Sequence, residues 1–135
     1  MRHQNELLRE ASLAKVNSYS PYSKFRVGAA ILLKDGTIIK GSNIENASYG
    51  LSMCAERVCL YNVYAQGYLK EDVVAMAVSA DTNDFIAPCG ACRQVMDELL
   101  NENCSVFLMN KKDEFKEVKV KKLLPNSFKG DVINE

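Results

Sequence analysis

The sequence has 135 residues, of which 47% are hydrophobic, and this suffices for a single domain (residues 1–135) with a buried core. Lysine plus arginine and aspartate plus glutamate number 17 each, so the formal net charge is zero. A neutral chain without a basic stripe lacks the electrostatic footprint of a polyanion binder, which argues against nucleic acid as a partner.

Composition and patterning also argue against a membrane protein. The first six residues lack the apolar core of a signal peptide, and no apolar run approaches the length needed to span a bilayer. We therefore expect a cytoplasmic protein with no membrane partner. In a reducing compartment, an odd set of five cysteines favours a metal or redox site over structural disulfides.

The first third of the chain predicts a helix and a hairpin. Residues 5–18 carry apolar side chains at helical spacing, and Pro21 then breaks the helix and opens a loop. Residues 25–33 and 37–43 are apolar, β-branched runs. They are separated by Lys34-Asp35-Gly36, a turn signal, so they should form an antiparallel pair.

The middle of the chain predicts a loop that leads into a second helix. Residues 41–52 are mostly small or polar, as in a loop. A helix should begin near Cys54 and end before Gly67, which is a good C-terminal stop. Because apolar residues lie on several of its faces, we expect this helix to be buried.

The next two elements are a strand and an amphipathic helix. Residues 73–80 form a continuous apolar run, typical of a central strand covered on both faces. Residues 89–100 predict a helix with its apolar side inward and with Arg93, Asp97 and Glu98 largely outward.

The last two strands, residues 105–109 and 115–120, should pair antiparallel. Only residues 110–114 separate them, whereas a parallel pairing needs a crossover of about a dozen residues or more. The order of elements predicts an α/β fold, a three-layer α/β/α sandwich around a mixed five-stranded sheet. Both cysteine-bearing helices follow strands, so their starts should meet at one edge of the core.

Three of the cysteines are spaced for a metal ion. Cys89 and Cys92 can converge over the first turn of a helix, and Cys54 opens the other helix. Zinc binds thiolates tetrahedrally, and three protein ligands leave a position for water, as in catalytic sites. A structural zinc site or a redox CxxC is the alternative. A structural site would need a fourth Cys or His, and the single histidine, His3, lies near the N-terminus.

Glu56 is the candidate catalytic base beside this metal. It follows Cys54 by two residues, and such positions do not share a helix face, so Glu56 is better placed to reach a water molecule than to chelate. The alternative is an exposed acid in the first turn, favoured by the helix dipole. The remaining cysteines, Cys59 and Cys104, are expected to be small buried apolar groups.

The segments Cys54-Ala55-Glu56 and Pro88-Cys89-Gly90-Ala91-Cys92 resemble the signature of zinc nucleobase and nucleoside deaminases. With Asn43-Ile44-Glu45-Asn46 and Phe25-Arg26-Val27-Gly28-Ala29-Ala30, the sequence is similar to the small cytidine deaminases over nearly its whole length. The resemblance implies hydrolytic deamination of cytidine and 2′-deoxycytidine in pyrimidine salvage. It also implies one Zn²⁺ per chain and a homotetramer with active sites at subunit interfaces.

The same resemblance implies roles for single residues. Glu56 would carry protons between water and substrate. Arg57 would offset the formal charge of −1 that three thiolates leave on a zinc site. The implied nucleoside contacts are Phe25 beside the pyrimidine, Asn43 and Glu45 at the ribose hydroxyls, the backbones of Ala55 and Cys89 at the base, and Phe128 in a neighbouring subunit's pocket.

Each of these roles has a plainer alternative. Arg57 could be a solvated surface residue, Phe25 a core aromatic, and Asn43 and Glu45 turn-capping loop residues. Phe128 could simply pin the chain end to its own core. For the whole protein, the alternatives are a deaminase of blasticidin-type aminonucleoside antibiotics and a non-catalytic binding module stabilised by zinc.

Overall fold

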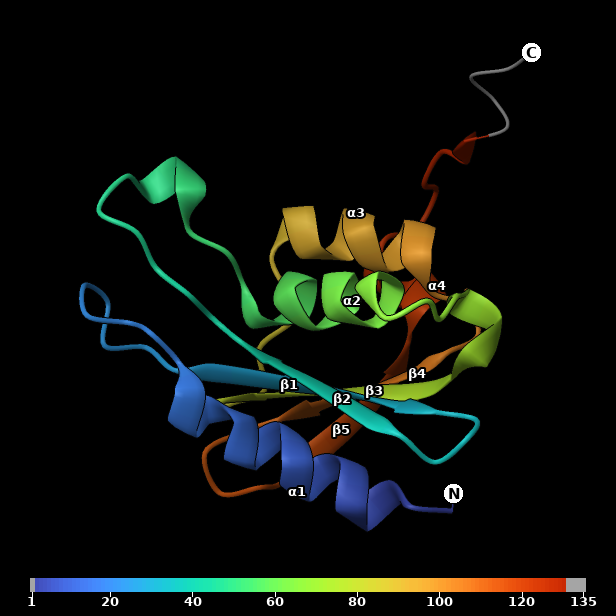
Figure 1. Cartoon of the computed structure of the whole chain (residues 1–135), viewed down its shortest axis with the longest axis horizontal. Helices are drawn as coiled ribbons and strands as arrows, with labels where there is room; N and C mark the ends of the chain where they lie inside the picture. Colours follow the sequence, from blue (N-terminus) through green and yellow to red (C-terminus); the bar gives the residue numbers. More distant parts are fainter. Residues whose placement is uncertain (1, 131–135) are drawn as a thin grey trace.

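The computed structural model describes residues 2–130 and contains one mixed sheet between two helical layers (Figure 1). The strands are β1 (Val27–Leu33), β2 (Ile38–Ser42), β3 (Val73–Ala80), β4 (Ser105–Met109) and β5 (Phe115–Lys119). They lie in the order β2-β1-β3-β4-β5. β1 is antiparallel to β2 and β3, β3 is parallel to β4, and β4 is antiparallel to β5.

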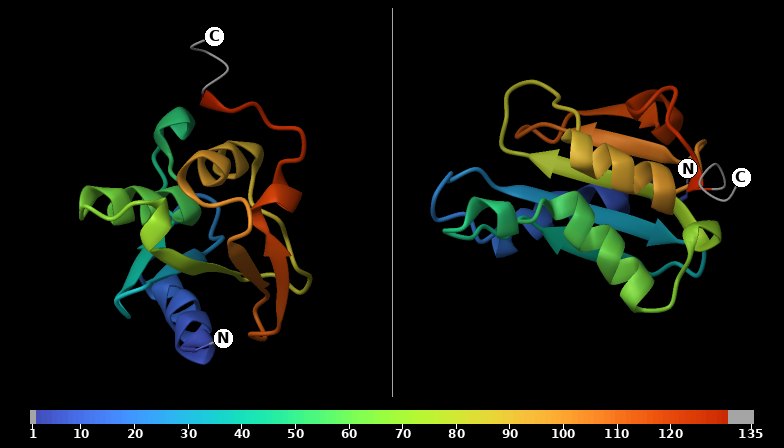
Figure 2. Two further views of the ribbon diagram at one scale, coloured as in Figure 1. Left: turned by 90° about the vertical axis from the view of Figure 1, so that its right-hand side faces the viewer. Right: turned by 90° about the horizontal axis from the view of Figure 1, so that it is seen from above.

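The helices are α1 (Gln4–Ala14), α2 (Ala55–Ala65), α3 (Gly90–Leu99) and α4 (Val120–Leu123), with short 3₁₀ turns at Lys15–Asn17, Tyr49–Leu51 and Lys70–Asp72. α1 covers one face of the sheet, whereas α2 and α3 lie side by side on the other, so the predicted α/β/α sandwich is confirmed (Figures 1 and 2). Each face has its own apolar core, with Leu7 and Ala11 of α1 in one and Leu60 and Met96 in the other.

Two glycines let helices approach the sheet closely. A Cβ atom on Gly28 would lie 2.3 Å from the carbonyl oxygen of Ala11 in α1. A Cβ atom on Gly41 would lie 2.5 Å from the backbone nitrogen of Cys59 in α2. Both distances are far inside van der Waals contact, so only glycine fits at these two crossings.

Some predicted element ends are wrong. α1 ends at Ala14 and the chain continues as a 3₁₀ turn. β1 begins at Val27 and not at Phe25, because the Asn43 side chain binds the Val27 N–H and the Phe25 carbonyl. After β5 the chain turns into α4, a helix that the sequence did not predict.

Two predictions about helix faces also need correction. Asp97 was expected outside, yet it is 7% exposed, because the chain segment after α4 binds its carboxylate. α2 was expected to be buried on several faces. Leu60 and Val63 are fully buried, but Tyr61 is 45% exposed because α2 covers the sheet with one side only.

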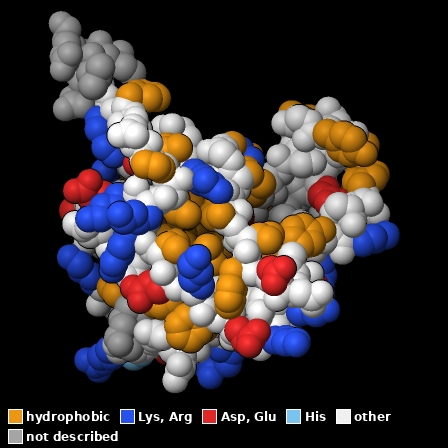
Figure 3. All heavy atoms as spheres, turned by 180° about the vertical axis from the view of Figure 1, so that it is seen from behind, with side chains coloured by type: hydrophobic (Ala, Val, Ile, Leu, Met, Phe, Trp, Pro, Cys, Tyr) orange, Lys and Arg blue, Asp and Glu red, His pale blue; other side chains and the backbone are white. Residues whose placement is uncertain are grey.

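Within residues 2–130, none of the helices combines the length and the apolar character needed to cross a membrane. On the face shown in Figure 3, basic and acidic side chains are intermixed. This mixing agrees with the balanced composition of the sequence.

Candidate active site

The starts of α2 and α3 bring three cysteines together. Cys54 is the N-cap residue of α2, Cys89 is the N-cap residue of α3, and Cys92 lies in the first turn of α3. Their Sγ atoms all lie within 4.8 Å of one another. The structure therefore assembles the predicted ligand set from segments that are distant in the sequence.

The spacing of the thiols fits a zinc ion. Zinc–sulfur bonds of about 2.3 Å in a tetrahedron place two sulfurs roughly 3.8 Å apart. The Sγ atoms of Cys54 and Cys89 are 3.8 Å apart. Thiolates are ligands that zinc prefers, and the Cys92 side chain is fully buried. Geometry and donor chemistry both fit a Cys₃ zinc site.

Arg57 stabilises negative charge at this cluster. Its guanidinium Nη2 donates to the Cys54 Sγ at 3.6 Å. Hydrogen bonds from Cys92 and then from Arg57 lower the pKa of the Cys54 thiol to about 5. Cys54 and Cys89 also cap helix N-termini, where partial positive charge favours a thiolate. The arginine thus lies against the thiols and not in open solvent.

Glu56 lies in the first turn of α2, only 6% exposed, and it lines the same cavity as Cys54 and Cys89. Burial raises the pKa of the Glu56 carboxyl to about 7. A carboxyl group with this pKa can both accept and release a proton near neutral pH. The structure excludes the alternative of a solvated first-turn acid.

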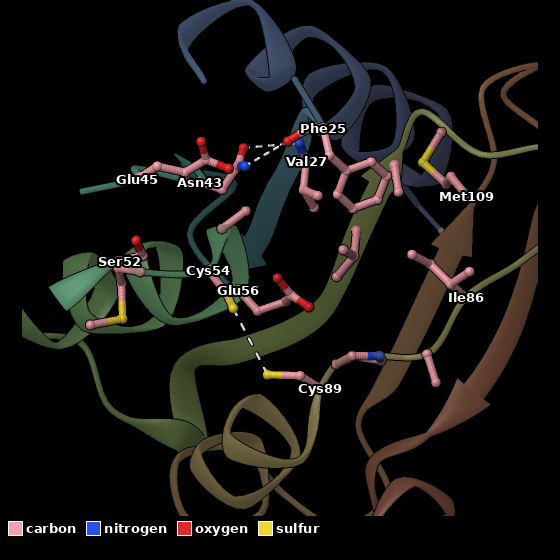
Figure 4. A pocket seen from close by; sticks show the side chains of 16 residues that line it. Phe25, Val27, Asn43, Glu45, Ser52, Cys54, Glu56, Ile86, Cys89 and Met109 are labelled. Carbon is pink, nitrogen blue, oxygen red and sulfur yellow. Dashed lines mark hydrogen bonds between the residues drawn. The ribbon is translucent and has the colours of Figure 1, made fainter. Parts of the chain in front are cut away.

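The cavity has a volume of about 340 Å³, large enough for a small organic ligand (Figure 4). Seven of the sequence-predicted site residues line it, namely Phe25, Asn43, Glu45, Cys54, Ala55, Glu56 and Cys89. Phe25 comes from the segment before β1, and Asn43 and Glu45 follow β2. With the starts of α2 and α3, four separate segments therefore meet around this cavity.

Asn43 and Glu45 hold the loop that carries Phe25. The Asn43 amide accepts from the Val27 N–H at 3.0 Å and donates to the Phe25 carbonyl at 2.8 Å. The Glu45 carboxylate accepts from the backbone N–H groups of Tyr22 and Ser23 and from the Ser23 hydroxyl. Both side chains still line the cavity. The loop-capping role is thus present in the structure, and the ribose contacts stay a prediction.

Phe128 is the one predicted contact residue that lies away from this site. Its side chain is 59% exposed and does not line the cavity of its own chain. The spare cysteines are placed as expected. Cys59 is fully buried, where its thiol donates to the Ile39 carbonyl at 3.2 Å, and Cys104 is 7% exposed.

Sequence patterns did not identify the apolar part of the cavity wall. Val27, Val78, Ile86 and Met109 also line the cavity, and Figure 4 shows Ile86 and Met109 on the side away from Asn43 and Glu45. Ile86 comes shortly before the Cys89 segment, and that proximity was the one available signal. The others lie in strands, where an apolar residue gives the same pattern whether it faces a core or a cavity.

Comparisons with known proteins agree with this geometry. Residues 1–108 match the family model of the cytidine and deoxycytidylate deaminase zinc-binding region. The cytidine deaminase of Halalkalibacterium halodurans is 50% identical over 129 residues, which cover 96% of each chain. The cytidine deaminase of Sporosarcina psychrophila is 46% identical, covering 91% of this chain and 89% of the relative.

Solved structures of similar proteins share the fold. The crystal structure of cytidine deaminase from Burkholderia pseudomallei superposes with a TM-score of 0.89 at 44% identity, covering 93% of this chain and 98% of the other. For the cytidine deaminase of Mycobacterium tuberculosis, the TM-score is 0.78 at 33% identity, covering 93% and 96%.

Proposed function

The chain belongs to the cytidine and deoxycytidylate deaminase family, and on this premise we propose that it converts cytidine and 2′-deoxycytidine, with water, to uridine and 2′-deoxyuridine plus ammonia. One observation carries the proposal above all. A buried carboxyl group, Glu56, shares a cavity with a three-thiol cluster that fits zinc. This combination can activate water and move protons, which is what hydrolytic deamination needs.

The metal site belongs to Cys54, Cys89 and Cys92, and one Zn²⁺ per chain is expected there. Zinc bound there would lower the pKa of a water molecule to about 7, so that this water could give up a proton at neutral pH and attack as a nucleophile. The protein controls the charge of this centre through Arg57, whose guanidinium donates to the Cys54 sulfur. Without that cation, three thiolates would make the site too electron-rich to acidify water.

Glu56 moves the protons of the reaction. Its carboxylate accepts a proton from the attacking water and delivers it to ring N3 of the pyrimidine, while the new C4–O bond forms. The remaining proton of that water, now on the C4 hydroxyl, passes through the same carboxyl group to the amino group, and the C4–N bond breaks to release ammonia as the C4 carbonyl forms. The low exposure of Glu56 keeps bulk water from competing for these protons.

The remaining cavity residues orient the nucleoside. Phe25 stacks beside the pyrimidine ring, and the backbones of Ala55 and Cys89 bind polar atoms of the base. Asn43 and Glu45 bind the ribose hydroxyls. They do so through hydrogen-bonding positions that their contacts to the loop do not occupy. The cavity positions of these residues support the assignment.

The protein works as a cytoplasmic homotetramer in pyrimidine salvage, with each active site at a subunit interface. The exposed Phe128 supports this proposal, because its ring finds no place in its own chain's cavity and is free to complete a neighbour's. The partly exposed Tyr61 on α2 supplies further apolar surface for an interface.

The direct test is an absorbance assay on the zinc-loaded protein. Cytidine and 2′-deoxycytidine should both lose their characteristic ultraviolet absorbance and release one equivalent of ammonia. A cytosine-containing single-stranded oligonucleotide should react far more slowly, because a neutral surface gives no counterion-release contribution to binding. No reaction with either nucleoside would support the non-catalytic module. Faster turnover of a blasticidin-type aminonucleoside would overturn the substrate assignment.

A further inference from the structure

A buried acid outside the active site has no part in the proposed reaction. Asp97 lies in the last turn of α3, and its side chain is only 4% exposed. Its carboxylate accepts from the Ser127 hydroxyl at 3.0 Å and forms an ion pair with Lys129 at 3.1 Å. Both partners belong to the segment that follows α4.

This location is unfavourable for an acid. The C-terminal turn of a helix carries partial negative charge, which disfavours a carboxylate, and burial adds a desolvation penalty. Such a group is tolerated when cations and hydroxyl donors compensate it. Here the described compensation comes from residues 127 and 129 together. The carboxylate therefore acts as an anchor point for this segment.

The anchor has a geometric consequence for the residue between its two partners. Ser127 and Lys129 both reach toward Asp97, so the side chain of Phe128 is left to project elsewhere. It is 59% exposed, more than the other exposed phenylalanines, Phe85 at 40% and Phe115 at 45%. The segment 127–129 is thus held by two of its three side chains, with the aromatic ring presented outward.

We propose that Asp97 is a positioning residue that holds Ser127 and Lys129 and thereby sets the direction in which Phe128 projects toward a second copy of the chain. The proposal rests on the proposed function, in which Phe128 completes a neighbouring nucleoside pocket. Beyond that function, Asp97 keeps the Phe128 ring ordered before the two copies of the chain meet. A free chain end would lose more conformational entropy on docking, whereas a held one binds more tightly.

The test compares matched variants of the zinc-loaded enzyme. Asp97→Ala removes the anchor, and Ser127→Ala with Lys129→Ala removes its two partners without touching α3. Glu98→Ala is the control, because it deletes an exposed acid of the same helix at the adjacent position. Asp97→Asn keeps an acceptor for the Ser127 hydroxyl but loses the charge, so its effects should be intermediate.

Two measurements are expected to change together. Amide hydrogen exchange of residues 127–130 should become faster in Asp97→Ala and in the Ser127/Lys129 double variant. KM for cytidine should rise about three- to tenfold in both, the range expected for the loss of an ordinary intramolecular hydrogen bond. Because no group of the reaction is altered, kcat should stay within about twofold. Glu98→Ala should match the wild type in both measurements.

A double variant separates positioning from a general structural effect. If Asp97 acts through Phe128, then Asp97→Ala should raise KM no further in a Phe128→Ala background. Additive effects, or unchanged exchange in Asp97→Ala, would overturn the proposal. So would faster exchange with an unchanged KM. If wild-type enzyme does not deaminate cytidine at all, the proposed function fails, whereas the exchange measurement still decides whether Asp97 holds the segment.

Discussion

Single residues at the metal centre combine a structural and a chemical task. Cys54 and Cys89 are N-cap residues of two helices, so a metal held between them also ties the helix starts together. Arg57 adds a cation that lowers the pKa of the Cys54 thiol. We therefore expect the same residues to govern both zinc affinity and the stability of the layer formed by α2 and α3.

Removing one thiol should cost metal and stability together. We expect Cys89→Ala to retain less than about a tenth of the zinc and to lose about 4 kcal/mol of unfolding free energy, the contribution of a ligand at about 1,000 times its Kd. Metal analysis and urea titration measure the two effects. Cys104→Ala, which removes a thiol outside the cluster, should keep its zinc. Full zinc occupancy in Cys89→Ala would exclude the Cys₃ site.

Local sequence was enough to predict the candidate metal ligands and Glu56, but it did not predict the tertiary contacts that surround a single side chain. The spacing of Cys89 and Cys92 over one helical turn, and of Glu56 beside Cys54, is local and needs no knowledge of the fold. The burial of Asp97 depends on residues 127 and 129, some thirty positions away, and no helical pattern reports that contact.

At the scale of helices and strands, close crossings hold the site in place. α2 carries Glu56 and packs on β2, and the two approach closely at Gly41, opposite the backbone of Cys59. Any side chain at this position would push α2 away from the sheet. The position of α2, and with it the position of Glu56, therefore depends on a residue that bears no side chain.

Gly41→Ala tests this crossing. Because the new methyl group would meet backbone atoms that cannot rotate away, we expect a loss of about 1–3 kcal/mol of unfolding free energy. Gly50→Ala is the matched control, since its Cβ atom would meet nothing within 4 Å. Its stability should change by less than about 0.5 kcal/mol. Equal urea midpoints for the two zinc-loaded variants would contradict the packing account.

The positions of the elements could be predicted from periodicity, and so could both ends of β3 and β4, but the start of β1 and the end of α1 could not. The apolar run of β3 and the short connection between β4 and β5 depend on neighbouring residues only, and both were predicted correctly. The start of β1 is set by the Asn43 side chain, which replaces strand pairing at Phe25. Hydrogen bonds of this kind join distant positions, so they leave no local pattern.

At the scale of the whole molecule, the proposed assembly makes each active site depend on two chains. Phe128 lies outside its own cavity, and Glu56 lies inside it. In a homotetramer, a site would then combine Glu56 of one subunit with Phe128 of another. Aromatic stacking on a base contributes about 1–3 kcal/mol, so Phe128→Ala should weaken substrate binding by roughly 5- to 150-fold.

Mixing two defective variants tests this dependence. Chains with Glu56→Ala and chains with Phe128→Ala are refolded together in the presence of zinc. Some mixed sites then contain an intact Glu56 and an intact Phe128, so activity should exceed the sum of the separate variants. Subunit exchange is verified by native mass spectrometry as the control. No gain despite exchange, or a fully active monomer by sedimentation, would show that Phe128 does not act across an interface.

The central claim is that Glu56 moves protons during deamination at a zinc site. Glu56→Gln preserves the size of the side chain but cannot accept the proton, and its zinc content should match the wild type. General acid–base catalysis contributes about 10²–10⁴-fold, and one group that serves two transfers should lie near the upper end of this range. The decisive measurement is kcat for cytidine in zinc-loaded Glu56→Gln. We predict a loss of about 10⁴-fold, and a variant that kept more than about a tenth of wild-type turnover would contradict the account.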